Sequence, residues 1–334
     1  MTKILLAGDH FVLPDHIRRA IDEACPGNSF EYSELMLPWP LIPFGRIGEV
    51  DEASGSEDEM IRALPDVAIC VTQMGPFTER VLAAGNALKL VCVTRGGPIN
   101  VNLDAAKKRG IKVLPTPGRN AAATAEHTVA LMLAALRRLP DRHASILSGE
   151  WRSDYYAFAE AGFEVEGSTV GLVGYGAVGS RVARILDGFG AHVLVYDPFA
   201  EIESEGSLEK VETLEALLSR SRIVSLHARL TEASRGMIGK GELAMMPQGS
   251  VLVNAARGGL LDYDALCDAL ESGRLFAAGL DVFDEEPLPA GSRLRSAPNL
   301  VMTPHLAGAT KETAHRAARI AADQVRRFMA GELS

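Results

Sequence analysis

The sequence has few of the features that mark several protein classes. Its four cysteines, Cys25, Cys70, Cys92 and Cys267, are far apart and form no CxxC pair. This argues against a disulfide framework and a metal cluster, and it fits a reducing compartment. Positive charge is in deficit, because the formal net charge is −9, whereas nucleic-acid binders normally present a basic face. We therefore expect no metal and no nucleic-acid partner.

Long uninterrupted apolar runs are also missing. The longest apolar stretch, residues 121–139, is broken by Glu126, His127, Arg137 and Arg138. It predicts a buried or interface helix rather than a membrane span. The N-terminal stretch MTKILLAG is too short for a signal peptide and is typical of a first strand. We therefore expect a cytoplasmic protein with no membrane partner.

Apolar strand-like runs alternate with helical patterns along most of the 334 residues, which is typical of parallel α/β sheets. The length suggests two domains. The first series of candidate strands comprises residues 3–8, 66–72, 88–95 and 111–117. The second series comprises residues 169–176, 192–198, 222–228, 250–256, 276–283 and 300–305.

Six parallel strands with helices between them make a complete dinucleotide-binding domain. We predict two doubly wound domains: a larger Rossmann domain over 119–305 and a smaller, flavodoxin-like domain over 1–118 and 306–334. The apolar spacing in 309–331 predicts a closing helix. Residues 38–59, rich in Pro, Gly and acids, predict a long surface loop with a short helix near its end.

A glycine motif follows the first strand of the second series. The stretch GLVGYGAVGS carries Gly174, Gly176 and Gly179 in GxGxxG spacing and opens an amphipathic helix. Gly174 permits the tight turn, Gly176 lets the backbone approach a pyrophosphate, and Gly179 allows close helix–strand packing. The helix N-terminus offers N–H groups to the anion. The predicted cofactor-binding residues of this turn are Gly174, Tyr175, Gly176, Ala177, Val178 and Gly179.

Asp197 ends the next strand at the distance that the dinucleotide fingerprint requires. A carboxylate there accepts hydrogen bonds from ribose hydroxyls and repels the extra phosphate of NADP. No basic residue follows directly in the run Pro198, Phe199, Ala200. The sequence therefore favours NAD.

Three further strand ends carry polar groups that suit carbonyl chemistry. Arg257 follows 250–256, an acidic cluster follows 276–283, and His305 ends 300–305. Arginine binds carboxylates with two hydrogen bonds, and histidine exchanges a proton near neutral pH. A carboxylate orients the histidine, but the residues alone do not decide between Glu285 and Glu286.

Several segments resemble the NAD-dependent D-2-hydroxyacid dehydrogenases. They are NAARGGLLDYDAL (254–266), GLDVFDEEPLP (279–289), NLVMTPHLAG (299–308) and RNAAATAEHTVALMLAALRR (119–138). In that family the working carboxylate directly precedes the proline, which selects Glu286. The resemblance implies a phosphoglycerate dehydrogenase-like enzyme without a regulatory domain.

The resemblance also implies a mechanism. Arg257 binds the substrate carboxylate, His305 exchanges a proton with the substrate oxygen, and Glu286 supports His305. Oxidation is then expected to rise with pH through a group above about 6.5, the ordinary histidine value. The further cofactor-binding residues that it implies are His227, Ala228, Ala255, Arg257, Asp281 and His305, with Asp281 near the nicotinamide carboxamide. The remaining histidines are expected to be structural: His10, His16, His127, His143, His192 and His315.

The first domain departs from the family pattern. In LVCVTRGGPINVNLDAA (90–106), Gly96 and Gly97 form a turn that can present N–H groups to a substrate carboxylate. Arg95 beside it either contacts a second anionic group of the substrate or forms a surface salt bridge. Arg229 stands where relatives often have proline, and its role is open. The predicted substrate-binding residues are Arg95, Gly96, Gly97, Arg257 and His305.

Two substrate classes and one other function stay open. A 3-phosphoglycerate-like substrate leads, with glyoxylate or hydroxypyruvate as the alternative. A NAD-sensing corepressor on the same fold keeps the same three residues and is the alternative of another class. Family members are usually dimers, and the apolar helix over 121–136 fits an interface.

Overall fold

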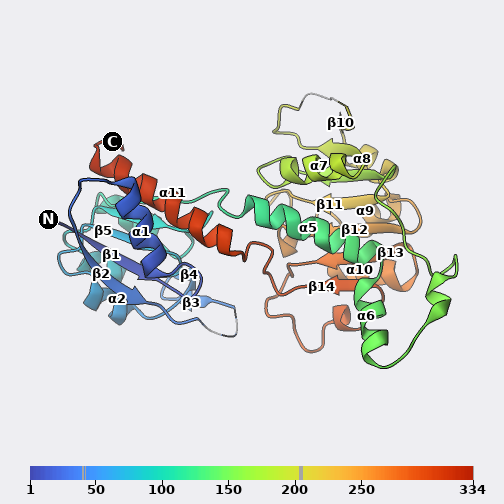
Figure 1. Cartoon of the computed structure of the whole chain (residues 1–334), viewed down its shortest axis with the longest axis horizontal. Coiled ribbons are helices and arrows are strands. Elements are labelled where there is room, and N and C mark those ends of the chain that lie inside the picture. The colour runs from blue at the N-terminus through green and yellow to red at the C-terminus, as the bar shows by residue number, and fades with distance from the viewer. Residues whose placement is uncertain (40, 42, 203–205, 334) are drawn as a thin grey trace. The chain divides into compact units, whose positions relative to one another are not determined.

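The computed structural model of the chain describes residues 1–39, 41, 43–202 and 206–333. Two compact units divide the chain (Figure 1): the first contains Met1–Asn120 and Ala309–Ser334, and the second contains Ala121–Gly308. Each unit has a parallel sheet with helices packed against it. This confirms the predicted α/β class with two doubly wound domains. The assignment of the substrate to the first unit stays a proposal.

The sheet of the first unit has five strands in the order β2-β1-β5-β6-β7, all parallel. This order is that of flavodoxin-like folds. Its elements are β1 (Thr2–Gly8), α1 (Pro14–Ala24), β2 (Phe30–Met36), β3 (Gly45–Ile47), β4 (Val50–Ala53), α2 (Glu57–Ala63), β5 (Ile69–Thr72), α3 (Glu79–Ala84), β6 (Leu90–Val93), α4 (Leu103–Lys108), β7 (Lys112–Pro115) and α11 (Lys311–Met329).

Burial explains which strands the sequence predicted. The central strands β5 (ICVT) and β6 (LVCV) are buried throughout, so they are continuous apolar runs. The edge strand β2 (FEYSELM) mixes exposed glutamates with partly buried residues and was not predicted. The predicted loop over 38–59 is partly wrong, because it contains the hairpin β3–β4; the short helix expected near its end is the start of α2. Residues 40 and 42 lie outside the described ranges.

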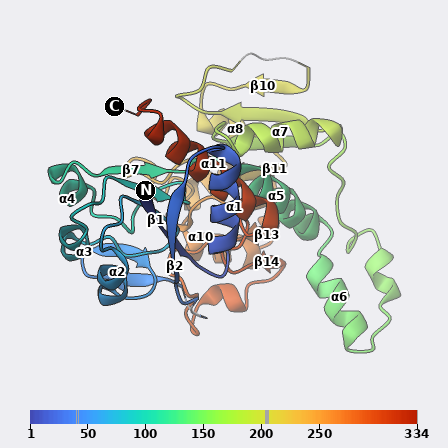
Figure 2. The same ribbon diagram turned by 60° about the vertical axis from the view of Figure 1, so that its left-hand side comes forward.

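Helices α1 and α11 lie side by side against one face of this sheet (Figures 1 and 2). Ile17 and Ile21 of α1 and the alanines Ala317 and Ala321 of α11 are fully buried. Small side chains let the two helices approach each other closely, and Ile4 of β1 lies in the same apolar cluster. The predicted C-terminal closing helix is therefore part of the core of the first unit.

The sheet of the second unit has seven strands in the order β10-β9-β8-β11-β12-β13-β14, again all parallel. The predicted count of six is wrong, because the three-residue strand β10 (LEK) has too little apolar character to be recognised. The elements of this unit are α5 (Ala121–Leu136), α6 (Leu139–Leu147), the 3-10 helix Ser153–Tyr156, β8 (Thr169–Val173), α7 (Gly179–Gly188), β9 (His192–Tyr196), β10 (Leu208–Lys210), α8 (Leu214–Arg220), β11 (Ile223–Leu226), α9 (Lys240–Met245), β12 (Ser250–Asn254), the 3-10 helix Gly258–Leu260, α10 (Tyr263–Glu271), β13 (Leu275–Leu280), the 3-10 helix Arg293–Arg295 and β14 (Leu300–Met302).

Helix α5 is a core helix of the second unit. It packs on β12, β13 and α7, with Ala125, Val129 and Met132 buried in one apolar cluster with Val170 of β8. Packing within one chain therefore accounts for its apolar residues without a partner. Among the described residues, no helix combines the length and apolar content that crossing a lipid bilayer requires.

Candidate functional site

The turn between β8 and α7 is tight on one side and open on the other. Gly174 has a φ of +104°, and a Cβ on it would lie 2.7 Å from the carbonyl carbon of His227. A Cβ on Gly179 would lie 2.3 Å from the carbonyl oxygen of Gly174, so α7 starts directly against the turn. A Cβ on Gly176 would contact nothing within 4 Å. The turn thus needs two glycines for its own packing and leaves the backbone at Gly176 open to a ligand.

Backbone N–H groups at the start of α7 are available to an anion. Within the described ranges, the N–H groups of Gly176, Ala177 and Val178 donate to no protein acceptor. The N–H of Ser180 donates to the carbonyl of Gly176 at 3.0 Å, where the helical hydrogen bonds begin. Free N–H groups at a helix N-terminus carry partial positive charge and bind phosphates. The turn therefore fits the pyrophosphate of a dinucleotide.

Asp197, at the end of β9, is fixed against this turn. Its Oδ2 accepts a hydrogen bond from the N–H of Tyr175 at 2.8 Å, and its Oδ1 accepts one from the N–H of Phe199 at 2.9 Å. The half-buried carboxylate is thus held where the ribose of a dinucleotide would lie. On β10, Nζ of Lys210 donates to the carbonyl of Ala200 at 3.1 Å. This nearby cation was missed because β10 was not predicted.

His227 and Ala228, after β11, form the floor of the turn, as the close approach of Gly174 to both shows. Nε2 of His227 is buried and has no hydrogen-bond partner in the described part of the chain. Burial lowers the pKa of His227 to about 4, so the ring is neutral near pH 7. A neutral ring with a free nitrogen fits a ligand-facing role rather than proton transfer. Ala255, at the end of β12, is buried in a cluster that includes Tyr175.

Glu286 and His305 are hydrogen-bonded to each other. Nδ1 of His305 lies 2.7 Å from Oε2 of Glu286, whose Oε1 accepts the N–H of Phe283 at 2.9 Å. The side chain of His305 is 50% exposed, and that of Glu286 is 25% exposed. Glu285, the alternative acid, is exposed. The carboxylate of Glu286 therefore orients the imidazole and leaves Nε2 as the ring nitrogen that can meet a substrate.

Neighbouring charges shift the pKa values of this pair. The hydrogen bond to Glu286 raises the pKa of His305; burial opposes the rise, the charges of Glu286 and Asp281 add to it, and Arg257 counteracts it. Burial tends to raise the pKa of Glu286, but the hydrogen bonds from His305 and Phe283 and the charge of Arg257 outweigh it and lower that pKa. Near neutral pH, Glu286 is therefore ionised, and His305 retains its proton better than a free histidine does.

The loop that carries His305 is held by Asp281. His305 has a φ of +50°, a left-handed conformation that costs a non-glycine residue roughly 1–3 kcal/mol and must be supported by its surroundings. Oδ1 of the fully buried Asp281 accepts the hydroxyl of Thr303 at 2.6 Å and the N–H of Leu306 at 2.9 Å. Its Oδ2 accepts the N–H of Ala307 at 2.8 Å. The carboxylate of Asp281 thus fixes both flanks of His305.

His127, expected to be structural, extends this support from α5. Its Nε2 lies 3.0 Å from Oγ1 of Thr303 and 3.6 Å from Oδ1 of Asp281. Its position within an apolar helical run gave no sign of this contact. The three side chains connect α5 to the loop of His305, and this second layer could not be read from motif spacing.

Arg257 follows β12 and is exposed. A Cβ on Gly258 would lie 1.9 Å from the carbonyl oxygen of Phe283, so the segment after Arg257 packs directly on the segment before Glu286. Among the described residues the guanidinium of Arg257 forms no ion pair. Its charge nevertheless acts on both Glu286 and His305. The second unit therefore gathers a cation, an acid and a histidine at the carboxyl ends of β12, β13 and β14.

In the first unit, the predicted substrate turn follows β6. Gly96 and Gly97 are exposed, and within the described ranges their N–H groups have no acceptor. The guanidinium of Arg95 pairs with the carboxylate of Glu52 and donates to the carbonyl of the same residue at 3.3 Å. The side chain of Arg95 is only 15% exposed. Of the two roles that the sequence left open, the salt bridge is the one that the structure contains.

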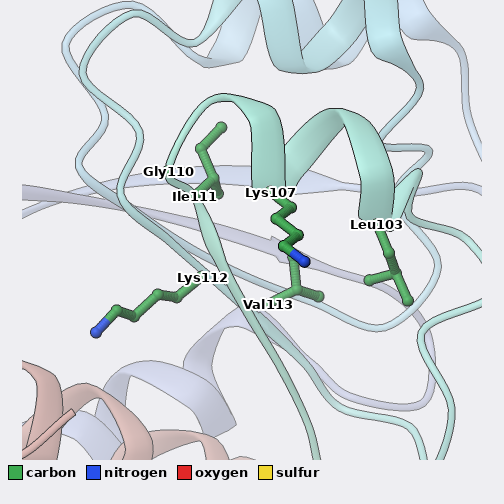
Figure 3. Close-up of a pocket in the computed structure, with 6 residues that line it drawn as sticks. All are labelled: Leu103, Lys107, Gly110, Ile111, Lys112 and Val113. Atoms are coloured by element: carbon green, nitrogen blue, oxygen red, sulfur yellow. The ribbon is translucent and has the colours of Figure 1, made fainter. Parts of the chain in front are cut away.

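Two hollows in the surface lie away from these residues. One, of about 370 Å³, is lined by residues from α4 to β7 (Figure 3). Another, of about 650 Å³, lies beside Phe163 and Phe189 in the second unit. Neither is lined by a predicted site residue, so the strand ends rather than these hollows mark the site. In the described part of the chain, no three His, Cys, Asp or Glu side chains are arranged to hold a metal ion.

Known proteins match this chain over most of its length. The family model "D-isomer specific 2-hydroxyacid dehydrogenase, NAD binding domain" matches residues 129–307. A glyoxylate reductase of Korarchaeum cryptofilum is 37% identical over 85% of this chain and 86% of its own length. A D-3-phosphoglycerate dehydrogenase of Methanocaldococcus jannaschii is 35% identical over 86% of this chain but 55% of its own length. This chain thus spans about half the length of the phosphoglycerate dehydrogenases that it matches.

A solved structure matches nearly the whole chain. It is the NAD-complexed form of a D-isomer specific 2-hydroxyacid dehydrogenase from Lactobacillus delbrueckii ssp. bulgaricus, with a TM-score of 0.79 and 25% identity. The match covers 99% of this chain and 98% of that one.

Proposed function

Because this chain belongs to the D-isomer specific 2-hydroxyacid dehydrogenases, we propose that it interconverts a D-2-hydroxyacid and its 2-oxoacid with NAD as the acceptor. The observation that carries the proposal is the 2.7 Å contact between His305 and Glu286 at the ends of the strands of an NAD-binding unit. A histidine oriented by a carboxylate is the acid–base device that carbonyl reduction needs.

In the proposed reaction His305 moves the proton. Its Nδ1 is bound to Glu286, so Nε2 donates to the substrate oxygen during reduction and accepts from the hydroxyl during oxidation. Glu286 stabilises the protonated imidazole, as the raised pKa of His305 indicates. Reduction should therefore weaken, and oxidation strengthen, as the pH rises through this raised pKa.

Arg257 and the Gly96–Gly97 turn are the groups assigned to the substrate carboxylate. The guanidinium of Arg257 has no carboxylate partner in the described chain and lies close enough to act on the charges of His305 and Glu286. It can bind a carboxylate with two hydrogen bonds. In the first unit, the free N–H groups of Gly96 and Gly97 also suit a carboxylate.

The cofactor assignment concerns the second unit alone. The open backbone at Gly176, the free N–H groups beside it, the carboxylate of Asp197 and Nε2 of His227 fit a bound dinucleotide. NADH, when bound, would supply the hydride. Asp197 favours NAD over NADP because its charge repels a ribose phosphate.

The substrate within this class has two leading candidates. A 3-phosphoglycerate-like substrate agrees with the names of the phosphoglycerate dehydrogenases that this chain resembles over about half of their length. Glyoxylate or hydroxypyruvate agrees with the glyoxylate reductase that it resembles over 86% of that protein. A NAD-sensing corepressor is the alternative of another class, and it would bind the cofactor without turnover.

We also propose a homodimer, formed through a different segment from the expected helix α5. Figures 1 and 2 show α6 and the segment after it projecting from the sheet of the second unit. Large apolar side chains are exposed along it: Leu139, Ile146, Leu147, Trp151, Tyr156 and Phe158. Such a patch is typical of a protein interface, and light scattering of the purified chain tests the assembly. A cytoplasmic location stays a prediction.

A panel of 2-oxo acids with NADH and NADPH side by side tests the proposed function. We expect turnover of at least one acid, faster with NADH than with NADPH. Cofactor binding without turnover of any 2-oxo acid in the panel would favour a NAD-sensing corepressor and contradict the proposed dehydrogenase activity. His305→Asn serves as the matched inactive control, because it removes the proton-transferring group while the glycine turn stays intact.

A further inference from the structure

Three buried polar atoms at the carboxyl edge of the first unit have no partner in the described part of the chain. They are Oδ2 of Asp9, Oε1 of Gln73 and Nη1 of Arg119. Asp9 is 0% exposed and Gln73 is 3% exposed. They follow β1 and β5, which are neighbouring strands. Since buried polar groups nearly always have partners, a cluster of unpaired ones indicates a place for a ligand.

Arg119 extends toward Asp9 from the end of β7, the strand at the opposite lateral edge of the sheet. It follows β7, which β5 and β6 separate from β1, so the two strand ends are roughly 14 Å apart at ~4.8 Å per strand. Yet the guanidinium of Arg119 lies 5.8 Å from the ring centre of Phe11, just after β1. The segment after β7 therefore brings Arg119 across the ends of β5 and β6. Arg316 of α11 fixes its backbone by donating to the carbonyl of Arg119 at 2.7 Å.

The charge of Arg119 lacks a close counterion. No carboxylate lies within 4 Å of its guanidinium among the described residues. Burial lowers the pKa of Arg119 to about 10, with Arg95 adding to the effect and Asp9 opposing it. The group therefore remains a cation near pH 7, and a buried cation without a partner is unfavourable until an anion joins it. Arg95, in contrast, is already paired with Glu52.

Asp9, whose charge acts on Arg119, and Gln73, after the neighbouring strand β5, add acceptors at this edge. Oδ1 of Asp9 accepts the N–H groups of Phe11 and Val12, both at 2.9 Å, which leaves Oδ2 for another donor. Oε1 of Gln73 is a second acceptor that has no partner among the described residues. A ligand that satisfies the whole cluster needs an anionic group for Arg119 and a hydroxyl group for the acceptors.

We propose that Arg119 binds a second acidic group at the far end of the substrate, with Asp9 and Gln73 accepting a hydroxyl beside it. The substrate class is then a 2-oxo or 2-hydroxy acid that ends in a carboxylate or phosphate. This inference rests on the proposed function, which uses the Gly96–Gly97 turn at the end of β6 for the first carboxylate. Both anion-binding elements thus lie on one edge of one sheet, on neighbouring strand ends.

Kinetics of Arg119→Met test the proposal. The probes are glyoxylate, which has one carboxylate, 2-oxoglutarate, which has a distal carboxylate, and 3-phosphohydroxypyruvate, which has a distal phosphate. We expect kcat/KM to fall roughly 10- to 100-fold for the preferred acid-ended probe and to change by less than about twofold for glyoxylate. Arg119→Lys should recover part of the loss. Arg109→Met, at an exposed arginine of the same unit, is the matched control.

The hydroxyl contact has its own comparison. The wild type should have a higher kcat/KM for 4-hydroxy-2-oxoglutarate than for 2-oxoglutarate. In Gln73→Met the ratio of the two kcat/KM values should fall roughly 5-fold or more. An unchanged preference in Gln73→Met would overturn the assignment of Gln73.

Anion binding can also be measured without turnover. Trp39 lies 6.4 Å from Phe11, the ring beneath Arg119, and Trp151 is the only other tryptophan. In a Trp151→Phe background, fluorescence of Trp39 should change in a saturable way with inorganic phosphate or malonate at constant ionic strength. The change should disappear in Arg119→Met, or in Arg119→Gln if the methionine variant does not fold.

The outcomes separate the subsite from the proposed function. An equal loss for all three probes, or a fluorescence change that Arg119→Met leaves intact, would overturn the subsite and make Arg119 a structural cation beside Asp9. If no 2-oxo acid is reduced at all, the proposed function fails, and the phosphate and malonate titrations alone then decide whether Arg119 binds anions.

Discussion

The carboxyl edges of the two sheets differ in how their polar groups are satisfied. In the second unit, Asp197, Asp281 and Glu286 each accept at least two hydrogen bonds from their own chain. In the first unit, Asp9 and Gln73 are almost fully buried, yet each has an oxygen with no partner among the described residues. The three acids of the second edge have their geometry fixed before any ligand arrives, whereas Asp9 and Gln73 of the first edge have oxygens that only a ligand can satisfy.

This difference agrees with two tasks: proton transfer at the edge of the second unit and substrate selection at the edge of the first unit. Proton transfer needs groups held close to one productive geometry, because small misplacements slow the reaction strongly. Substrate choice needs groups whose unpaired state penalises the wrong ligand. We therefore expect changes at Asp281, Glu286 and His305 to lower turnover of every substrate, and changes at Gln73 and Arg119 to act on some substrates only.

The largest expected effect comes from His305→Asn. It removes the proton-transferring group, so kcat should fall by about 10²- to 10⁴-fold for every 2-oxo acid of the panel. Steady-state kinetics with NADH measure it, and NADH binding by fluorescence should remain. A kcat within a few-fold of the wild type would show that the proton moves by another route and would break the contrast between the edges.

A smaller loss is expected from Thr303→Val. The change removes a hydroxyl that donates to Asp281 at 2.6 Å and lies 3.0 Å from Nε2 of His127. The buried carboxylate then lacks one donor, which costs roughly 1–3 kcal/mol of unfolding free energy. Because the loop of His305 loosens, kcat should fall roughly 10-fold. Urea denaturation and kinetics measure the two effects.

The matched control for this loss is Thr128→Val, which removes a buried hydroxyl bonded only within α5, to the carbonyl of Thr124 at 2.7 Å. It should lower stability without lowering kcat. Equal effects of the two variants on kcat would mean that the loop of His305 does not depend on Thr303.

The most selective effect, on the choice of cofactor rather than on turnover, is expected from Asp197→Ser. Removing this carboxylate should raise kcat/KM with NADPH relative to NADH by roughly 10-fold, because the repulsion of the ribose phosphate disappears. Asp187→Ser, at an exposed acid of the same unit, is the control. An unchanged ratio in Asp197→Ser would assign the preference to other groups, with Lys210 on β10 the first to test.

Continuous apolar runs made the central strands predictable, because strands buried on both faces have almost no polar positions. Strands β2 and β10 lie at sheet edges and lack this signal. The glycine turn could be predicted because its glycines lie in one short stretch of chain, where Gly174 and Gly179 meet steric needs and Gly176 leaves the backbone open. Glu286 needed the family pattern, since Glu285 has the same chemistry one residue away.

The supports of the site were beyond prediction from the sequence. His127 lies 176 residues from Thr303, and Arg119 meets Phe11 across the width of a sheet. Contacts of this kind depend on tertiary packing, and no local spacing encodes them. Arg95 illustrates the same point, because its pairing with Glu52 comes from the hairpin that the sequence did not predict.

The most direct test of the account is the pH dependence of kcat for reduction in the wild type and in Glu286→Gln. The hydrogen bond to Glu286 raises the pKa of His305, so the wild type should keep its activity at low pH and lose it as the pH rises through that raised value. In Glu286→Gln the loss should begin at lower pH, with a lower kcat throughout. Identical profiles in the two proteins, with proton transfer shown to limit the rate, would contradict the pairing of Glu286 with His305 as the acid–base device.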